Sequence, residues 1–477
     1  MSTVSDAPPD KTGYGKGGRR AGRPARGAAV VRQVRGRLTS WLARPLASLH
    51  LVVGLLVLLT GLGLVMVLSA SSVEAYALDG SAYSLFTRQV IFAVAGLVLF
   101  YVALRLPVRI MRRCALPALV TCVVLLALVL VPGVGHLVNG ARAWFVLGPV
   151  SLQPSEPTKI IFAVWGAHLL AIKRGQLHTL RHMLIPLIPA ALLIVGLIVV
   201  EPDLGNTITL GLVIMGLLWF AGAPVKLFLA LVLAAGGGAL VLALSVSYRS
   251  ARIASFLNPS ADPQGAGYQA MQATYALADG GLWGVGLGQS RAKWSYLPEA
   301  QNDFIFAIIG EELGFIGAAL VLVLFGILAY LGLRIASRSA DPFLRLVTAT
   351  VTVWLVGQAI INIGYVVGLL PVTGVTLPLI SSGGTSTAVT MFVFGLLANA
   401  ARHEPQAIAA MRTGGQGRFA KLLRLPPPEP YVVRPTPQAV REQPPRRMPE
   451  QRRGQGRQPA RGPRPRSAGP VRRLRDR

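Results

Sequence analysis

The sequence is short of the residues on which several protein classes depend. Only 19 of its 477 residues are acidic, and its two cysteines, Cys114 and Cys122, lie eight positions apart on one expected helix. A helix places them too far apart for a structural disulfide. The patterns GxxxxGK[ST], HExxH, GxSxG and CxxC are absent. The chain therefore lacks the motifs of P-loop ATPases, zinc proteases, serine hydrolases and dithiol oxidoreductases.

Apolar residues, in contrast, are in excess: 53% of the chain is hydrophobic and only 14% is charged. Apolar stretches of about 18 residues recur, each long enough to cross a bilayer, and period-two alternation is missing. We therefore expect an all-α polytopic membrane protein without a cleavable signal peptide, because about 46 polar residues precede the first apolar run. We expect ten spans, at residues 49–70, 89–106, 114–132, 156–173, 183–200, 205–222, 226–247, 303–333, 344–369 and 384–401.

The net charge of +28 is concentrated at the two ends of the chain. Residues 1–46 hold ten basic and two acidic residues, and residues 402–477 hold nineteen and five, which gives +8 and +14. Both ends are rich in proline, glycine and arginine, so we expect disordered tails at 1–46 and 403–477 around a membrane domain at 47–402. Such tails could bind nucleic acid or an acidic cytoplasmic partner. Attraction to anionic lipid is the simpler interpretation, and we expect no nucleic-acid partner.

The connections between spans predict the orientation. Basic residues gather in four of them: 107–113, 174–182, 223–225 and 334–343. Nearby acidic residues lie in the opposite connections: Glu74, Asp79, Glu201 and Asp203. By the positive-inside rule, the basic connections and both termini are cytoplasmic. The other side then carries the glycine-rich loop 248–302, whose length indicates a functional role.

Three carboxylates, Asp303, Glu311 and Glu312, lie at the entrance to the eighth span and inside it. An ionised carboxylate in hydrocarbon is costly and persists mainly where it faces a polar cavity. On a straight helix, Asp303 and Glu312 point in nearly opposite directions and cannot share one cavity. We expect Asp303 to be the catalytic candidate, although a carboxylate there could simply cap the helix. Glu311 and Glu312 are expected to support the structure by hydrogen bonds.

Two further outer segments carry charged residues. Glu156 and Lys159 share one face of the fourth span. They either form an anchoring ion pair or line a polar cavity, where Lys159 and Arg142 could bind an anionic ligand such as a pyrophosphate. In the turn EPDLGN, Glu201 and Asp203 could help to hold a divalent cation, Mg or Mn, although a helix-capping turn is the simpler interpretation.

The segment 370–386, LPVTGVTLPLISSGGTS, contains two prolines and three glycines between apolar runs. This composition predicts an irregular or re-entrant segment, which a membrane protein tolerates only where it is buried in protein or lines a cavity. An ordinary outer loop with tight turns is the alternative. A cavity-lining segment would bring four residues to a substrate: Ser381, Ser382, Gly383 and Gly384.

Over about residues 47–402, these segments together resemble the SEDS family (shape, elongation, division and sporulation). The matching segments keep their order and spacing: QPSEPTKI (153–160), EPDLGNT (201–207), GYQAMQATYALADGGLWGVGLGQS (267–290), LPEAQNDFIFAIIGEELG (297–314) and NIGYVVGLLPVTGVTLPLISSGGTS (362–386). The last two are more similar to the division type, FtsW, than to the elongation type, RodA. The family commonly reads GAxRW where this chain has Gly140-Ala141-Arg142-Ala143-Trp144. Alanine therefore occupies the usual arginine position, and a flexible loop could let Arg142, one residue earlier, take the place of that arginine.

The resemblance implies a peptidoglycan glycosyltransferase of the bacterial cytoplasmic membrane, at the division septum. It would polymerise lipid II into an undecaprenyl-linked glycan strand, beside a class B penicillin-binding protein and other division proteins. Asp303 matches the family's essential aspartate, and Glu156 and Lys159 match polar cavity residues. We expect inverting transfer with Asp303 as the general base. A lipid II flippase and a scaffold are the rivals, but the polar residues cluster at the outer face and Asp303 is intact, which favours the enzyme.

Overall fold

The computed structural model describes residues 44–138, 140–148, 150–176, 179–245, 256, 258, 266–294, 297–413 and 424–431. The disordered tails that we expected at the two ends of the chain therefore fall largely outside the described residues, at 1–43 and 432–477. The chain divides into the units Met1–Pro430 and Tyr431–Arg477, and every element named here belongs to the first. Its main helices are α2 (Ala47–Asp79), α3 (Ser84–Arg105), α4 (Val108–Val129), α5 (Ser155–Ile172), α6 (Leu180–Leu184), α7 (Leu187–Val200), α8 (Leu204–Phe220), α9 (Val225–Ser245), α11 (Ala266–Gly280), α12 (Ile305–Arg338), α13 (Pro342–Val366), α14 (Thr385–Arg402) and α15 (Pro405–Thr413).

The chain is a mostly helical membrane protein. Among the described residues, six helical stretches are long and apolar enough to cross a bilayer: Ala47–Asp79, Ser84–Arg105, Val108–Val129, Leu180–Val200, Ile305–Arg338 and Pro342–Val366. The helices α8 and α9 are apolar but contribute shorter stretches. The helices α5 and α14 carry polar side chains that face neighbouring helices, such as Lys159 and Asn399. Helices of this kind are stabilised by their position inside a bundle.

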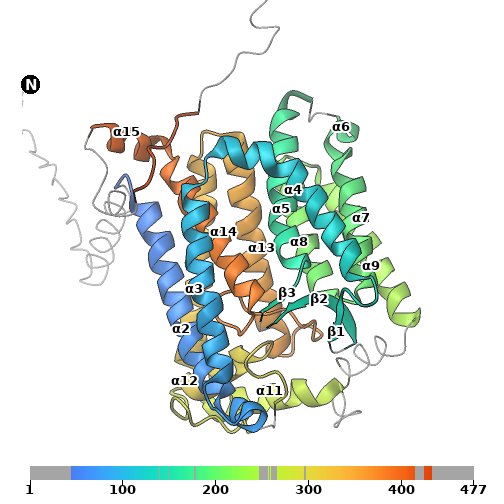
Figure 1. The fold of residues 1–477 in the computed structure, drawn as a ribbon, viewed down its shortest axis with the longest axis vertical. Coiled ribbons are helices and arrows are strands. Elements are labelled where there is room, and N and C mark those ends of the chain that lie inside the picture. Colours follow the sequence, from blue (N-terminus) through green and yellow to red (C-terminus); the bar gives the residue numbers. More distant parts are fainter. Residues whose placement is uncertain are drawn as a thin grey trace, which may run out of the picture. The chain divides into compact units, whose positions relative to one another are not determined.

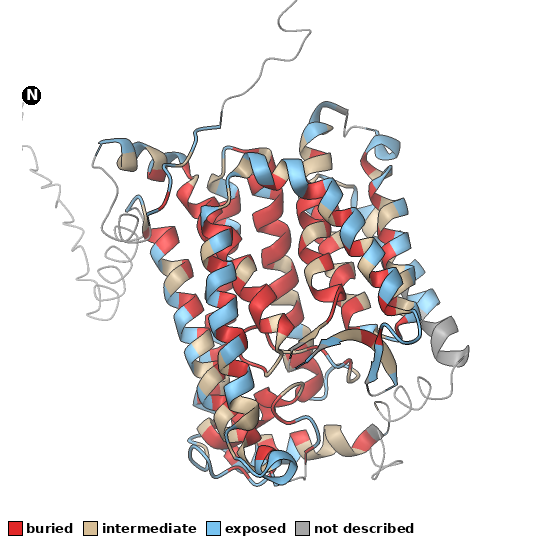
Figure 2. Ribbon diagram, viewed as in Figure 1, coloured by how far each residue is buried: buried red, intermediate tan, exposed pale blue. Residues whose placement is uncertain are grey.

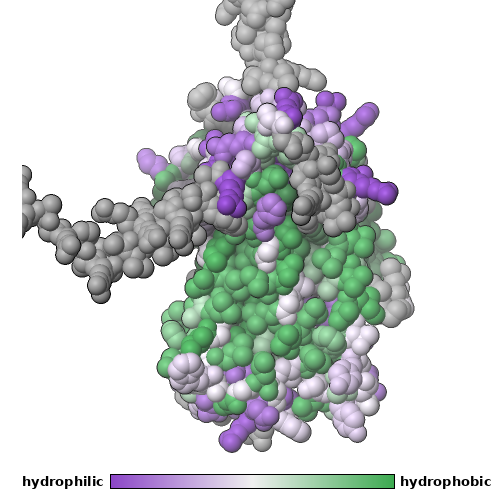
Figure 3. All heavy atoms as spheres, turned by 90° about the vertical axis from the view of Figure 1, so that its left-hand side faces the viewer, coloured by the Kyte–Doolittle hydropathy of each residue, from purple (hydrophilic) through white to green (hydrophobic). Residues whose placement is uncertain are grey.

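The helices of this unit pack with α13 and α14 at the centre and with α2, α4, α7 and α9 around them (Figure 1). The central helices are buried, whereas the outer helices expose apolar side chains (Figure 2). On the face that carries α2, these side chains form a broad apolar band between two polar ends (Figure 3). Such a band is what a bilayer covers. Among the described residues, buried polar side chains such as Lys159, Asn362 and Asn399 lie between helices.

A small sheet corrects the expectation of a purely helical chain. The strands β1 (His136–Val138), β2 (Ala141–Leu147) and β3 (Val150–Leu152) form an antiparallel sheet in the order β1-β2-β3. Strands of three to seven residues inside a connection are too short to give a clear period-two signal. The sheet lies at one end of the helices and α15 at the other (Figure 1). We call these the sheet end and the α15 end.

The eighth expected span is kinked. Gly314 interrupts α12 with φ 68° and ψ −167°, a backbone conformation that favours glycine. A Cβ atom built on Gly314 would lie 2.4 Å from the Gly284 nitrogen and 2.5 Å from the Leu282 oxygen. The preceding loop therefore packs backbone against backbone on the kink. The straight helix assumed from the sequence is wrong at this position.

Some residues of the expected C-terminal tail are packed on the membrane domain. Residues 405–413 form helix α15, and Leu425 is only 2% exposed within the hydrophobic core. The Arg402 guanidinium donates hydrogen bonds to the Leu104 oxygen at 3.1 Å and to the Pro426 oxygen at 2.5 Å. This part of the tail contains apolar residues that find a packing site, which its high content of proline and arginine concealed.

Candidate active site

Asp303 lies in a turn at the sheet end, two residues before α12 begins. The N-cap residue of α12 is Phe304, and the side chain of this N-cap residue makes no capping hydrogen bond. The Asp303 main-chain oxygen accepts hydrogen bonds from Asn362 Nδ2 at 2.8 Å and Tyr365 Oη at 2.9 Å. The same two groups donate to the Val375 oxygen, at 2.7 and 2.8 Å. Asn362 and Tyr365 of α13 therefore fix the Asp303 turn against residues 371–384 (segment 371–384), the part of the expected irregular segment 370–386 that precedes α14.

The side chain of Asp303 is half-buried and faces Gly374. A Cβ atom on Gly374 would lie 3.5 Å from Asp303 Oδ2, and Gly374 has φ +73°. Sequence reasoning did not single out Asn362 and Tyr365. Their signal was the presence of polar side chains inside an apolar span, where such groups are costly unless they have partners.

The irregular segment is buried in protein at several positions, as the sequence predicted. A Cβ atom on Gly63 of α2 would lie 2.3 Å from the Leu379 oxygen, so the segment packs directly on that helix. Ser381 is 2% exposed, and its Oγ accepts a hydrogen bond from the Leu377 nitrogen at 2.8 Å. The Ser381 hydroxyl therefore stabilises the turn itself.

Ser382, Gly383 and Gly384 are more open and lie where α14 begins. The Ser382 nitrogen donates to the Gln301 oxygen at 2.9 Å, which joins these residues to the Asp303 turn. Thr385 Oγ1 donates to the Ser151 oxygen of β3 at 2.7 Å. The structure thus brings Asp303, the SSGG turn and the small sheet together at the sheet end.

Lys159 and Glu156 form a buried ion pair of 2.9 Å. Lys159 is 1% exposed, donates to Asn206 Oδ1 at 2.7 Å and lies 5.1 Å from the centre of the Trp354 ring. Asn206 Nδ2 in turn donates to Asp203 Oδ2 at 2.7 Å. The ion pair anticipated as one alternative is therefore present, and it joins α5 to the start of α8.

Asp203 is the N-cap of α8. Its carboxylate accepts hydrogen bonds from the Asn206 nitrogen at 2.8 Å and from Gln153 Nε2 at 2.7 Å. These bonds support the capping interpretation of the EPDLGN turn. A Cβ atom on Gly205 would lie 3.0 Å from the Thr373 oxygen, so this network lies across segment 371–384 from Asp303. Within the described residues, no group of three or more His, Cys, Asp or Glu side chains could hold a metal ion.

Glu201 is fully buried beside this network, and neither of its carboxylate oxygens has a hydrogen-bond partner among the described residues. Burial, reinforced by the nearby Asp203 carboxylate, raises the pKa of Glu201 from 4.5 to about 8. A carboxyl with a raised pKa favours the folded state when it is protonated, and this contribution is lost as the pH rises towards 8.

We therefore expect Glu201→Gln to flatten the pH dependence of stability. The melting temperature of the wild type in lipid nanodiscs should fall between pH 5 and pH 9, because the folded state must ionise a buried group. Glu201→Gln should show a smaller fall. Glu74→Gln, which changes an exposed acid, should keep the wild-type slope. Equal slopes for the wild type and Glu201→Gln would refute this assignment.

Arg142 lies on β2 opposite Leu137 and is partly exposed. Its guanidinium forms no hydrogen bond or ion pair with the described residues.

Glu311 and Glu312, by contrast, are each 1% exposed, and their carboxylates accept hydrogen bonds. Ser290 Oγ and the Arg291 nitrogen donate to Glu311 at 2.5 and 2.7 Å. Ser69 Oγ of α2 donates to both Glu312 oxygens at 2.6 and 2.7 Å.

These contacts divide the carboxylates by role. Glu311 joins the preceding loop to α12, and Glu312 joins α2 to α12. These contacts agree with the supporting role that we expected for both residues. Lys293 Nζ lies 4.0 Å from Glu312 Oε1, which adds a weak buried attraction. The predicted site residues that are partly exposed are Asp303, Ser382–Gly384, Arg142 and Asp203. Of these, Asp203 is already engaged as the N-cap of α8.

Comparison with known proteins identifies the family. Residues 49–406 match the FtsW/RodA/SpoVE model, described as a cell cycle protein. The chain is 54% identical over 442 residues to a protein of Mycobacterium tuberculosis named probable peptidoglycan glycosyltransferase FtsW, covering 90% of this chain and 84% of that protein. It is 42% identical over 358 residues to stage V sporulation protein E of Bacillus subtilis, covering 75% and 97%.

Two solved structures share the fold. One belongs to a peptidoglycan synthase complex studied for its coordination of polymerization and crosslinking, with a TM-score of 0.62 and 29% identity over 74% of this chain and 98% of that one. The other is the rod shape determining protein RodA of Thermus thermophilus, with a TM-score of 0.55 and 29% identity over 77% and 99%.

Proposed function

Since the chain belongs to the FtsW/RodA/SpoVE family of cell cycle proteins and is a peptidoglycan glycosyltransferase, we propose that it polymerises lipid II during cell division. The single observation that carries the assignment of the site is the position of Asp303. Its carboxylate faces the irregular segment at the sheet end, while hydrogen bonds from Asn362 and Tyr365 hold its backbone. A fixed, half-buried carboxylate of this kind suits a general base.

In the proposed reaction, Asp303 accepts the proton of an acceptor sugar hydroxyl. The hydroxyl oxygen then attacks the anomeric carbon of the donor, and the bond from that carbon to the lipid pyrophosphate breaks with inversion. The leaving pyrophosphate carries the developing negative charge, which nearby donors would stabilise. We assign this task to Arg142 and to residues Ser382–Gly384, which are partly exposed. Ser382–Gly384 lie directly before α14, and Arg142 lies on the sheet that Thr385 contacts through the Ser151 oxygen.

Lys159 and Glu156 contribute differently in this proposal. Their ion pair and the bond to Asn206 hold α5 and α8 together behind segment 371–384. They would shape the wall of the substrate site and position its backbone groups. A divalent cation, Mg or Mn, would be held mainly by the substrate's phosphates with one protein carboxylate, as is usual for magnesium.

We also propose that the sheet end faces the outside and that the chain crosses the bilayer ten times. Each of the ten expected spans overlaps a described helix. The helix ends and connections at the α15 end contain Arg109, Arg112, Arg174 and Arg338, which agrees with a cytoplasmic position by the positive-inside rule. Both termini would then lie in the cytoplasm, and the site would face the side on which the cell wall is built.

The partner in this proposal is a class B penicillin-binding protein. The structural neighbour in a complex that coordinates polymerization with crosslinking supports such a partner. The septum would be the location, since the chain is 54% identical over 442 residues to a protein named FtsW. The undecaprenyl chains of the substrate would lie between helices, and the basic tails would attract anionic lipid or an acidic cytoplasmic protein.

A flippase is the rival function. It needs a polar pathway that reaches both faces, whereas Asp303 and the separate network of Lys159 and Asp203 both lie at the sheet end. The test combines two assays of the purified chain, with and without a penicillin-binding protein whose crosslinking serine is replaced. We expect glycan strands from lipid II on a gel, and no lipid II scrambling in vesicles. Scrambling without strand formation would favour the flippase.

A further inference from the structure

The loop formed by residues 281–287 is fixed to the kink of α12 by its backbone. The main-chain nitrogens of Val285 and Gly286 donate hydrogen bonds to the main-chain oxygens of Glu311 and Glu312, at 2.9 and 3.0 Å. In the other direction, the Phe315 nitrogen donates to the Gly281 oxygen at 2.9 Å. The loop is therefore hydrogen-bonded on both sides of Gly314, like an added strand of backbone.

This close approach depends on Gly284, which has φ +81°. A Cβ atom at that position would lie 2.2 Å from the Glu312 oxygen. Just beyond the loop, Ser290 and Arg291 bind the buried Glu311 carboxylate. These contacts fix the backbone of residues 281–287 and fill the space beneath it. The side chains of the loop therefore cannot turn towards α12.

The side chains of this rigid loop are nevertheless large, apolar and exposed. Trp283 is 77% exposed, and three neighbours are exposed as well: Leu282 at 54%, Val285 at 44% and Leu287 at 55%. Exposed apolar residues gathered in one patch mark a surface that contacts lipid or another protein. The sequence interpretation placed this loop in the outer connection 248–302, whose length indicates a functional role.

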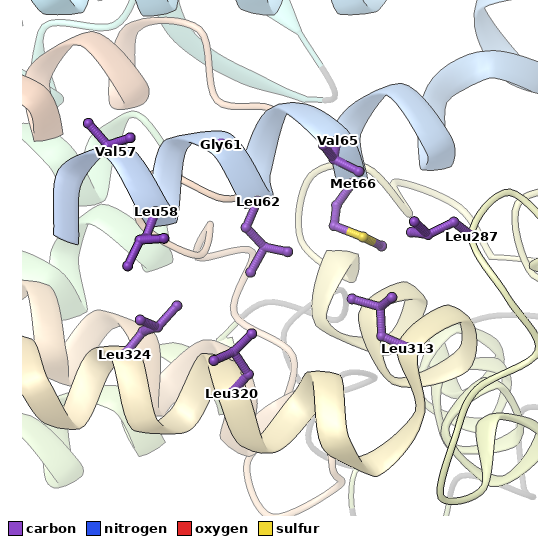
Figure 4. Close-up of a pocket in the computed structure, with 10 residues that line it drawn as sticks. All are labelled: Val57, Leu58, Gly61, Leu62, Val65, Met66, Leu287, Leu313, Leu320 and Leu324. Carbon is purple, nitrogen blue, oxygen red and sulfur yellow. The ribbon is translucent and has the colours of Figure 1, made fainter. Parts of the chain in front are cut away.

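The patch continues directly into the lipid-facing surface of the helices. Phe315 and Ile316, which receive the loop at the kink, are 64% and 48% exposed on α12. Leu287 also closes one end of an apolar groove of about 400 Å³ between α2 and α12. Figure 4 shows Leu287 beside Met66 of α2 and Leu313 of α12, in line with Leu62 and Leu320 deeper in the groove. The loop and the helices thus present one continuous apolar surface.

We propose that residues 281–287 are inserted into the bilayer leaflet at the sheet end, with Trp283 at the boundary between headgroups and acyl chains. Tryptophan favours this boundary because its ring is apolar and its N–H is polar. Because the loop is bonded to both sides of Gly314, its insertion would set the depth of the α12 kink and of Glu311 and Glu312. The proposal rests on the membrane surface and does not depend on glycosyl transfer.

The test is a nitroxide spin label at position 283. Trp283→Cys is made in a chain in which Cys114 and Cys122 are replaced by serine, labelled, and placed in vesicles of phosphatidylethanolamine and phosphatidylglycerol. We expect the label to be accessible to oxygen and shielded from a water-soluble nickel chelate. Gln289→Cys is the matched control, because Gln289 is exposed on the same connection but polar. Its label should be accessible to nickel.

If Trp283→Cys does not fold, Leu287→Cys gives the same measurement, since Leu287 belongs to the same patch. Adding Trp283→Asp to the Leu287 label should move that label towards water. Labels at 283 and 287 that are as accessible to nickel as the one at 289 would overturn the proposal. Shielding that arises only when a penicillin-binding protein is added would overturn it as well, because the patch would then be a protein interface.

Discussion

An Asp303→Asn variant is expected to fold like the wild type and to form glycan strands about 10²–10⁴-fold more slowly, the usual contribution of a general base. Asparagine has almost the same shape, but its amide cannot accept the proton of the attacking hydroxyl. The bonds from Asn362 and Tyr365 reach the main-chain oxygen of residue 303, so the substitution leaves them in place. The expected loss is therefore chemical and not structural.

Glu299→Gln is the matched control. Glu299 is an exposed carboxylate of the same turn, and its side chain accepts a hydrogen bond from Asn302. It has no place in the proposed reaction, so Glu299→Gln should polymerise lipid II at the wild-type rate. The rates are measured from the length and amount of strands made by purified protein, beside melting curves for each variant. Wild-type activity in Asp303→Asn would remove Asp303 from the mechanism.

Lys159→Met is expected to give the largest loss of stability. The substitution keeps most of the apolar volume but leaves the Glu156 carboxylate buried without its cation, 2.9 Å from where Lys159 Nζ was. Removing one partner of a buried ion pair typically costs about 3–5 kcal/mol. The bond to Asn206 and the contact with Trp354 are lost too. The thermal unfolding of Lys159→Met in nanodiscs should therefore occur well below that of the wild type.

The double variant Glu156→Gln with Lys159→Met separates charge from packing. It removes both charges, so it should recover much of the stability that Lys159→Met alone loses. If Lys159→Met alone had the melting temperature of the wild type, Lys159 would not be part of a structural ion pair. Lys159 would then be available to substrate, which is the alternative that the sequence left open.

The helices could be predicted from the sequence for clear physical reasons, whereas the catalytic role of Asp303 stays a prediction. Apolar runs of bilayer length locate helices whatever their neighbours are, and a costly carboxylate such as Asp303 is conspicuous in one. The roles of Glu311 and Glu312 followed from helical spacing, and their bonds to Ser290 and Ser69 agree. The agreement holds even though α12 is kinked, because both residues precede Gly314.

What could not be predicted depends on segments that are distant in the sequence. Whether Glu156 and Lys159 pair with each other or face a ligand is decided by Asn206 and Trp354, which lie about 50 and 200 positions further on. The small sheet is too short to show its period. The kink at Gly314 requires the backbone of residues 282–286, and no local pattern in α12 announces that contact.

The central claim, that the chain is itself a lipid II polymerase, is tested most directly in nanodiscs that hold one copy of the protein. Both faces of a nanodisc are open to the solvent, so moving lipid from one leaflet to the other makes no product, and any glycan strand reports chemistry. With a crosslinking-deficient penicillin-binding protein present, we expect the wild type to make strands and Asp303→Asn to make almost none. Strands from both proteins, or from neither, would contradict the account.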